Sequence, residues 1–150
     1  MLRISQRCEY AIRALLELAL RTGPQPVTIA DVARAQSLPP KFLAAILAQL
    51  KQVGLVESVR GMQGGYRLAR RPHQITVGQV VRLLDGPVEP VCCSKAGDGG
   101  DGRERSDSIL TDIRHEIRRA VEHVLDGTTF ADLVEREHRR RAALTTNYCI

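Results

Sequence analysis

Apolar residues near the N-terminus recur every three to four positions, which predicts an amphipathic helix from about Ser5 to Leu20. Ser5 is a suitable N-cap, because its hydroxyl can accept a hydrogen bond from the first turn. The apolar face of this helix is made by Tyr10, Ala11, Ala14, Leu15, Leu18 and Ala19. We expect that face to pack beneath the helices that follow.

Residues 28–52 predict two further helices around a tight turn near residues 35–38. Thr28 and Asp31 have the spacing of a capping box at the start of the first of these helices. The second helix begins at a pair of prolines, which preset the backbone dihedral of a first helical turn. Its i, i+3, i+4, i+7 spacing gives one core-facing stripe, made by Leu43, Ile46, Leu47 and Leu50.

The other side of this second helix carries small or polar residues. They are Lys41, Ala44, Ala45, Ala48 and Gln49. A helix that enters the major groove of DNA needs such residues on its exposed face. An ordinary helical hairpin followed by an unrelated β-hairpin would show a similar pattern and remains the alternative.

Gly54 ends the second helix, and a short apolar run with Leu55, Val56 and Val59 follows it. A loop over residues 60–65 comes next and contains one arginine and three glycines. This pattern predicts a two-stranded hairpin whose tip lets backbone and guanidinium groups approach another molecule closely. The order helix, turn, helix and hairpin is typical of a winged helix-turn-helix DNA-binding domain.

The residues predicted to contact DNA lie on the helix caps, the turn, the second helix and the hairpin. They are Ser5, Thr28, Ser37, Pro39, Lys41, Arg60, Gln63, Gly64, Gly65 and Tyr66. We expect Lys41 and its neighbours to contact the major groove. The hairpin would meet the DNA backbone and the minor groove, which Gln63 could enter.

Positive charge is concentrated in the same half of the chain. Residues 1–75 contain eleven Lys or Arg and four acidic residues, a net charge of +7. The whole chain has 22 basic and 17 acidic residues, so residues 76–150 carry 11 − 13 = −2. A basic half attracts DNA phosphates with an affinity that falls as salt rises. Arg60, Arg67, Arg70 and Arg71 could bind backbone phosphates.

The second half of the chain predicts a short helix, a loop and a long helix. The short helix begins with a capping box formed by Thr76 and Gln79. The long helix runs from Asp107 to Gly127 with a narrow apolar stripe of Leu110, Ile113, Ile117, Ala120, Val121 and Val124. A narrow stripe after a complete small domain favours pairing with a second copy, since DNA readers commonly pair two half-sites by two-fold symmetry. Packing on its own domain is the alternative.

Composition limits the location of the protein. The 150 residues are 43% hydrophobic but contain no run of about 18 apolar residues that could span a membrane. We therefore expect a soluble cytoplasmic protein with no membrane partner. The four histidines lack the spacing of a metal or nucleophile motif, and no phosphate-binding glycine loop leads into a helix, so we expect no enzyme activity.

Several motifs in the correct order resemble the Rrf-type winged-helix regulators, the family of IscR, NsrR and CymR. They are Ile4-Ser5, Tyr10 to Leu16, Gly54-Leu55-Val56, Arg60-Gly61, Gly64-Gly65-Tyr66, Leu68-Ala69-Arg70, Pro72 and Ile75-Thr76-Val77. The resemblance implies a dimeric bacterial transcription factor whose long helices cross at the dimer interface. It also implies an effector site in the loop before the long helix, which in some members holds an iron-sulfur cluster on three cysteines and a fourth ligand.

The loop of this chain departs from that cysteine pattern. It contains only the adjacent pair Cys92 and Cys93. The resemblance places Cys93 at the first ligand position and Glu9 where some members supply an acidic ligand, with Cys8 beside it. A two-iron two-sulfur cluster held between subunits by Cys93, Cys92, Cys8 and Glu9 is one hypothesis, although thiolates are the usual ligands.

A cluster-free regulator that responds to redox state, nitric oxide or a ligand through the Cys92/Cys93 loop is the second hypothesis. A winged-helix protein-docking module that does not bind DNA is the third. We favour a mostly α-helical homodimeric repressor that binds a palindromic operator. Residues 1–86 would form the winged helix-turn-helix domain, 87–106 the sensor loop, and 107–150 the dimerisation helix with a C-terminal helix and tail.

Overall fold

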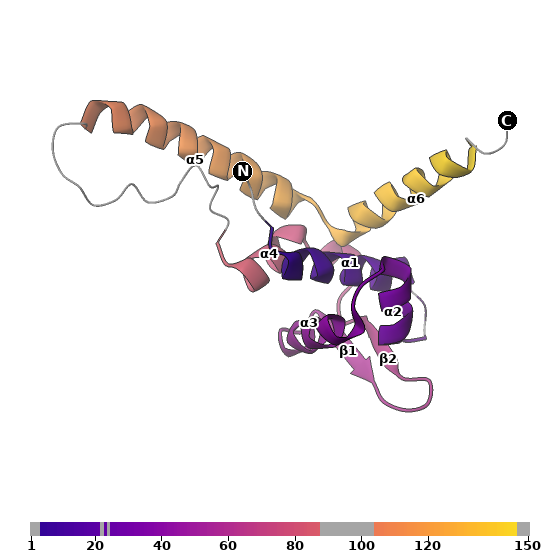
Figure 1. Ribbon diagram of the computed structural model, residues 1–150. Helices are drawn as coiled ribbons and strands as arrows, with labels where there is room; N and C mark the ends of the chain where they lie inside the picture. Colours follow the sequence, from indigo (N-terminus) through magenta and orange to yellow (C-terminus); the bar gives the residue numbers. More distant parts are fainter. Residues whose placement is uncertain (1–3, 22, 24, 88–103, 147–150) are drawn as a thin grey trace.

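The computed structural model describes residues 4–21, 23, 25–87 and 104–146, with side chains omitted for 104–108 and 145–146 (Figure 1). Within these ranges the chain is mostly helical with one two-stranded antiparallel sheet, as predicted. The elements are α1 (Gln6–Leu20), α2 (Ile29–Gln36), α3 (Pro40–Gln52), β1 (Val56–Val59), β2 (Gly65–Leu68), the 3-10 helix η1 (Pro72–Gln74), α4 (Val77–Asp85), α5 (Glu104–Gly127) and α6 (Phe130–Thr146). Cys92 and Cys93 lie outside the described residues.

Helix α1 forms the centre of the core and contacts α2, α3, α4, α6 and β2. Ser5 caps it as predicted, because the Ser5 hydroxyl accepts a hydrogen bond from the Cys8 N–H at 3.1 Å. The predicted apolar face is buried apart from Tyr10, which is half-buried. Its small alanines allow the neighbouring elements to pack closely around one helix.

Helices α2 and α3 form the predicted helix-turn-helix. Ser37 makes the turn in a left-handed conformation with φ +52°, and α3 buries all four residues of its predicted stripe. The Thr28 hydroxyl caps α2 by accepting from the Asp31 N–H at 3.1 Å. The Asp31 carboxylate accepts from the Thr28 hydroxyl at 2.8 Å, whereas in the predicted capping box it would accept from the Thr28 backbone.

A buried carboxylate ties this turn to α1. Glu17 is 4% exposed and accepts hydrogen bonds from Arg21 Nε at 2.6 Å and Gln36 Nε2 at 2.9 Å. Arg13 donates to the Gln36 backbone carbonyl at the same turn. Because a buried charge is costly unless it is paired, these contacts fix the end of α2 relative to α1.

The wing is the hairpin of β1 and β2, which pair from Val56 with Leu68 to Val59 with Gly65. An isolated bridge between Val27 and Tyr66, with two backbone hydrogen bonds of 2.8 Å, joins β2 to the segment before α2. A Cβ on Gly65 would lie 2.4 Å from the Val27 carbonyl oxygen. This glycine therefore permits a close contact within the chain.

Gly64 has the same role at the tip of the wing. A Cβ there would lie 2.5 Å from the carbonyl oxygen of Val59 and 2.8 Å from that of Gly61. The sequence pattern indicated that the glycines open the tip to another molecule. The described geometry explains Gly64 and Gly65 by contacts within the chain. With larger residues at these two positions, the hairpin could not close on itself or pack against the Val27 segment.

Helix α4 connects the winged domain to α5 and α6. Its predicted capping box of Thr76 and Gln79 is present, with N···O distances of 3.2 and 3.3 Å. The Val77 N–H donates to the Thr128 carbonyl at 2.9 Å, next to a salt bridge between Arg82 on α4 and Asp126 on α5. These contacts hold the C-terminal end of α5 against the winged domain.

The two last helices project away from the wing (Figure 1). Helix α5 begins at Glu104, three residues before the predicted start at Asp107. Phe130 at the start of α6 is fully buried, and its N–H donates to the Ile75 carbonyl at 2.9 Å. The Thr129 hydroxyl accepts from the Asp132 N–H at 3.2 Å and so caps α6.

The basic run near the end of α6 is exposed, as a solvated helix end would be. Arg139 pairs with Glu135 at 2.6 Å. Arg140 and Arg141 both bind Glu137 and hold the pKa of its carboxyl at about 2. These arginines are therefore compensated by acids of their own helix.

We expect the substitution Gly65→Ala to lower the free energy of unfolding by about 1–3 kcal/mol, the usual cost of overpacking. The added methyl group would force the Val27 and Tyr66 backbones apart. Thermal or urea unfolding of the purified protein measures the effect. Gly127→Ala is the matched control, because nothing lies within 4 Å of its Cβ position. Equal stability of the two variants would show that the close contact is unimportant.

Candidate nucleic-acid interface

The exposed face of α3 and the wing form one candidate surface. Lys41, Ala45 and Ala48 are exposed on α3, and Ala44 and Gln49 are half-exposed, as predicted. Phe42 is the residue that the sequence analysis missed. Its side chain is 65% exposed, although phenylalanine is usually buried, so the face is less small and polar than expected.

The start of α3 has unused hydrogen-bond donors. Pro39 occupies the N-cap position and offers no side-chain hydrogen bond, whereas the first turns of α1, α2 and α4 are capped by Ser5, Thr28 and Thr76. Because Pro40 has no N–H, the backbone N–H groups that lack a side-chain cap in this first turn are those of Lys41 and Phe42, and both residues are exposed. A helix N-terminus with free N–H groups favours a phosphate.

Ion pairs neutralise some of the basic residues in residues 1–75 and leave the others to carry the net positive charge. All four acids of residues 1–75 lie within 4 Å of an arginine, in the pairs Glu9 with Arg13, Glu17 with Arg21, Asp31 with Arg34, and Glu57 with Arg67. The described cations of this half without a carboxylate partner are Arg7, Lys41, Lys51, Arg60, Arg70 and Arg71, of which Arg7 and Lys51 donate to Gln49 and Ser58 instead. The charge without a carboxylate partner thus lies at the start of α1, on α3, at the wing and just after β2.

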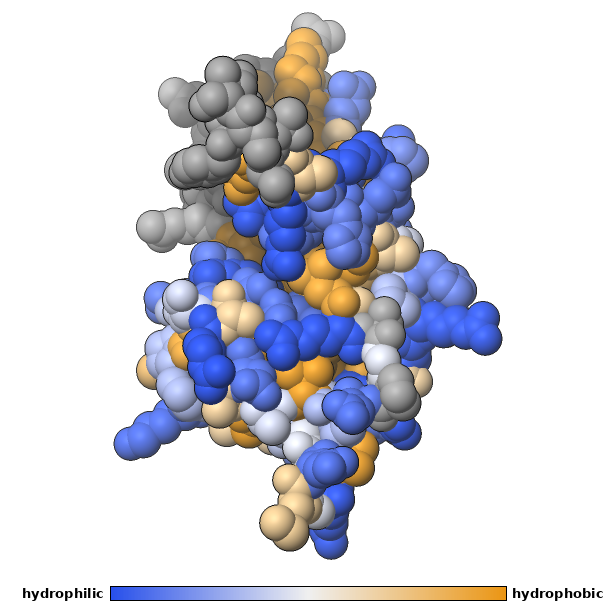
Figure 2. Space-filling view, turned by 90° about the vertical axis from the view of Figure 1, so that its right-hand side faces the viewer, coloured by the Kyte–Doolittle hydropathy of each residue, from blue (hydrophilic) through white to orange (hydrophobic). Residues whose placement is uncertain are grey.

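The tip of the wing is the most protruding part of the domain. Arg60, Met62 and Gln63 are all exposed there. Figure 2 shows that the lowest part of the molecule, which in Figure 1 is the wing, carries both hydrophilic and apolar surface. Lys51 on α3 donates to Ser58 on β1 at 2.5 Å, which joins the helix to the wing. A mixed, protruding tip of this kind suits entry into a DNA groove.

None of the ten residues predicted to contact DNA is buried. The structure nevertheless uses several of them internally. The Ser5 hydroxyl donates to Asp85 of α4, and the Thr28 hydroxyl donates to Asp31. Tyr66 is half-buried at the bridge to Val27. Lys41, Arg60 and Gln63 make no side-chain contact of this kind among the residues described.

The predicted metal ligands on α1 differ in accessibility. Glu9 is exposed. Cys8 is 0% exposed within the core, and burial, aided by the Asp85 carboxylate, raises the pKa of its thiol to about 12. Iron ligation requires the thiolate, and a ligand shared between subunits must reach the surface. The ligand role predicted for Cys8 does not fit this position.

No other donor set in the described parts of the chain replaces it. Among residues 4–87 and 109–144, apart from the two undescribed positions, no three His, Cys, Asp or Glu side chains are grouped closely enough to hold a metal ion. Cys92 and Cys93, two of the four predicted ligands, lie outside the residues that were compared in this way. The same ranges contain no helix that is both long and apolar enough to cross a membrane.

Comparison with known proteins shows what the chain is similar to. A sequence model of the Rrf2 family, described as "Iron-dependent Transcriptional regulator", matches residues 4–136. The protein Rv1287 of Mycobacterium tuberculosis is 39% identical over 132 residues, which cover 88% of this chain and 81% of that protein. The family and its relatives CymR and IscR are transcriptional regulators and not enzymes, in agreement with the sequence analysis.

Solved structures agree with the observed architecture. The structure of CymR from Bacillus subtilis, titled "the Global Cysteine Regulator", superposes with a TM-score of 0.75 at 34% identity, covering 91% of this chain and 98% of that one. The structure of IscR from T. potens gives a TM-score of 0.71 at 32% identity, covering 91% and 88%. The chain belongs to the Rrf2 family of winged-helix transcriptional regulators.

Proposed function

We propose that this protein is a cytoplasmic homodimeric repressor that binds a palindromic operator through α3 and the wing. The observation that carries the proposal is the position of unpaired cations on the α3 and wing surface. Lys41 lies at the uncapped start of α3, and Arg60 lies at the wing. Cations that lack an internal partner remain available to neutralise phosphates and release counterions.

We assign the contacts with the grooves and phosphates of DNA to residues according to their exposure. In this proposal the start of α3, with Pro39 and Lys41, lies in the major groove. Ser37, in the turn before α3, lies near the DNA backbone. The exposed ring of Phe42 has the chemistry to contact a thymine methyl group. Gln63 and Arg60 contact the minor groove and phosphates, while Ser5, Thr28, Gly64, Gly65 and Tyr66 shape and support this surface through the internal contacts described above.

The long helix supports a dimer. Five large apolar residues of α5 are between 41% and 66% exposed in the single chain, namely Ile109, Leu110, Ile113, Ile117 and Val124. Four of them recur at helical spacing and form one stripe along a helix of 24 residues. Burying this stripe against the same stripe of a second copy would remove it from water and set the separation of the two wings.

We further propose that the adjacent Cys92 and Cys93 sense a signal without a cluster. Cys8 is buried and the pKa of its thiol is raised to about 12, so the proposal assigns sensing to Cys92 and Cys93. A reactive thiol near Lys95 and Arg103 in the sequence would have its thiolate stabilised by these cations. Oxidation or nitrosation of the thiols would then change operator affinity.

We expect Arg60→Ala to weaken binding to promoter DNA about tenfold and to lower the slope of log affinity against log salt by about 1, as for one lost phosphate contact. Fluorescence anisotropy with the promoter of its own gene, at several salt concentrations, measures both quantities. Arg139→Ala removes the same charge from the ion-paired end of α6 and should change neither. A winged-helix docking module would bind no DNA at any salt concentration.

We expect the double variant Ile113→Glu/Ile117→Glu to be monomeric, because four carboxylates would face one another across the proposed interface. Sedimentation velocity measures the change. His115→Glu is the control, since His115 is exposed on the opposite side of α5 and should leave a dimer intact. A double variant that remains dimeric would place the interface elsewhere.

We expect diamide oxidation to change the DNA affinity of the wild type and of Cys149→Ser but not of Cys92→Ser/Cys93→Ser. Diamide acts on accessible thiols, and Cys8 is shielded by the core. Anaerobically purified protein should be colourless and free of iron. Visible absorbance with stoichiometric iron would overturn cluster-free sensing and support the cluster hypothesis.

A further inference from the structure

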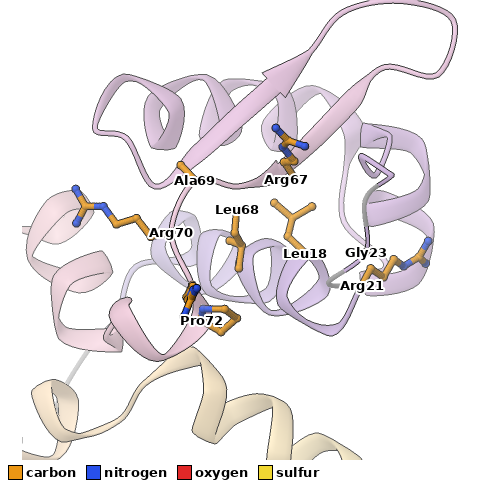
Figure 3. Close-up of a pocket in the computed structure, with 9 residues that line it drawn as sticks. Leu18, Arg21, Gly23, Arg67, Leu68, Ala69, Arg70 and Pro72 are labelled. Atoms are coloured by element: carbon orange, nitrogen blue, oxygen red, sulfur yellow. The ribbon is translucent and has the colours of Figure 1, made fainter.

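A cavity of about 520 Å³ lies at the base of the wing, where the chain leaves β2 and passes the C-terminal part of α1. Figure 3 shows Leu18 of α1 and Leu68 of β2 at its centre, with Pro72 of η1 beneath them. These three side chains form an apolar floor. The volume lies within the range of about 300–1,000 Å³ that is common for small-molecule sites.

Four arginines surround this floor. Arg21 lies on one side, Arg70 on the opposite side and Arg67 above, and Arg71 also lines the cavity. Arg21 and Arg67 are paired with Glu17 and Glu57, so their charges are compensated.

The remaining two arginines of the cavity are not compensated. Arg70 and Arg71 are exposed and have no carboxylate within 4 Å among the described residues. The cavity therefore combines an apolar floor with a rim that carries two free positive charges. A guanidinium group binds phosphate or carboxylate oxygens in a bidentate manner, which makes arginine suited to oxyanion recognition.

The cavity is separate from the part of the wing proposed to meet DNA. The strand pairing runs from Val59 with Gly65 at the tip to Val56 with Leu68 at the base, so the cavity begins at the far end of the hairpin. The Ala69 N–H donates to the Leu55 carbonyl at 3.0 Å, which holds this end of the hairpin against the segment after α3. A recess lined partly by α1 is also less accessible to a continuous phosphate backbone than an exposed ridge.

We infer that this cavity binds a small organic anion, in which a phosphate or carboxylate group contacts Arg70 and Arg71 and an apolar group rests on Leu18 and Leu68. The site goes beyond operator binding, since it uses neither α3 nor the wing tip. An occupant would contact both α1 and β2, the two elements that join the core to the wing.

Titration of the full-length protein without DNA tests this inference. The probes are 1-naphthyl phosphate and 1-naphthoate, which distinguish a phosphate from a carboxylate group. Two further probes each carry only one part of these molecules: 1-naphthol has the apolar ring without the anion, and inorganic phosphate has the anion without the ring. We expect saturable calorimetric binding of at least one naphthyl anion, tighter than either half probe. Arg70→Ala/Arg71→Ala should raise its dissociation constant at least tenfold.

The matched control is Arg139→Ala/Arg140→Ala, which removes the same charge on α6 and should bind the probe like the wild type. Ala69→Glu places a carboxylate at the cavity and should also abolish binding, and thermal unfolding checks that each variant folds. Equal weakening by both double variants, or no saturable binding of either naphthyl anion at millimolar concentration, would overturn the inference. Loss of promoter affinity in Arg70→Ala/Arg71→Ala with probe binding unchanged would assign these arginines to DNA phosphates instead.

Discussion

The burial of α1 is the constraint on which the rest of the structure depends. This helix contacts α2, α3, α4, α6 and β2, so the helix-turn-helix, the wing and the base of the C-terminal helices are all positioned by one element. Alanines at positions 11, 14 and 19 make this possible, because larger residues would separate the surrounding helices. Apolar packing alone does not fix the orientation of one helix relative to another. The buried Glu17 does so, because its carboxylate accepts hydrogen bonds from Arg21 and from Gln36 at the end of α2.

Local patterns were sufficient to predict the elements. The stripe of α3, the Ser5 cap and the Thr76 capping box depend on neighbours within one or two turns, and the structure confirms them. Contacts between distant segments were not predictable in this way. The exposure of Phe42 depends on how α3 packs on α1, and the reason for Gly65 depends on Val27, 38 positions earlier. The sequence pattern therefore singled out the glycine but did not reveal the contact with Val27.

At the candidate site too, the sequence predicted the total charge, whereas the pairing of individual charges depends on the fold. Composition predicted a basic half with a net charge of +7, but counting cannot say which cations carry that charge. The ion pairs answer the question, because each of the four acids lies beside an arginine and leaves Arg7, Lys41, Lys51, Arg60, Arg70 and Arg71 without a carboxylate partner among the described residues. Lys41 and Arg60 lie on the surface proposed for DNA, whereas Arg70 and Arg71 lie at the cavity behind it. From the sequence, Lys41 is expected at the major groove, and Arg60, Arg70 and Arg71 are all expected at backbone phosphates.

The start of α1 offers a physical connection between the loop that carries Cys92 and Cys93 and the DNA-binding surface. Ser5 donates from both its backbone N–H, at 2.8 Å, and its hydroxyl to Asp85, at the C-terminal end of α4 and seven residues before Cys92 in sequence. Helix α1 then contacts both α2 and α3. Because α1 is tightly packed, a displacement of α4 at Asp85 would move α1 as a rigid body and change the position of α3 relative to the duplex. In the proposed function, the Ser5 hydroxyl would therefore couple α4 to α1 without touching DNA.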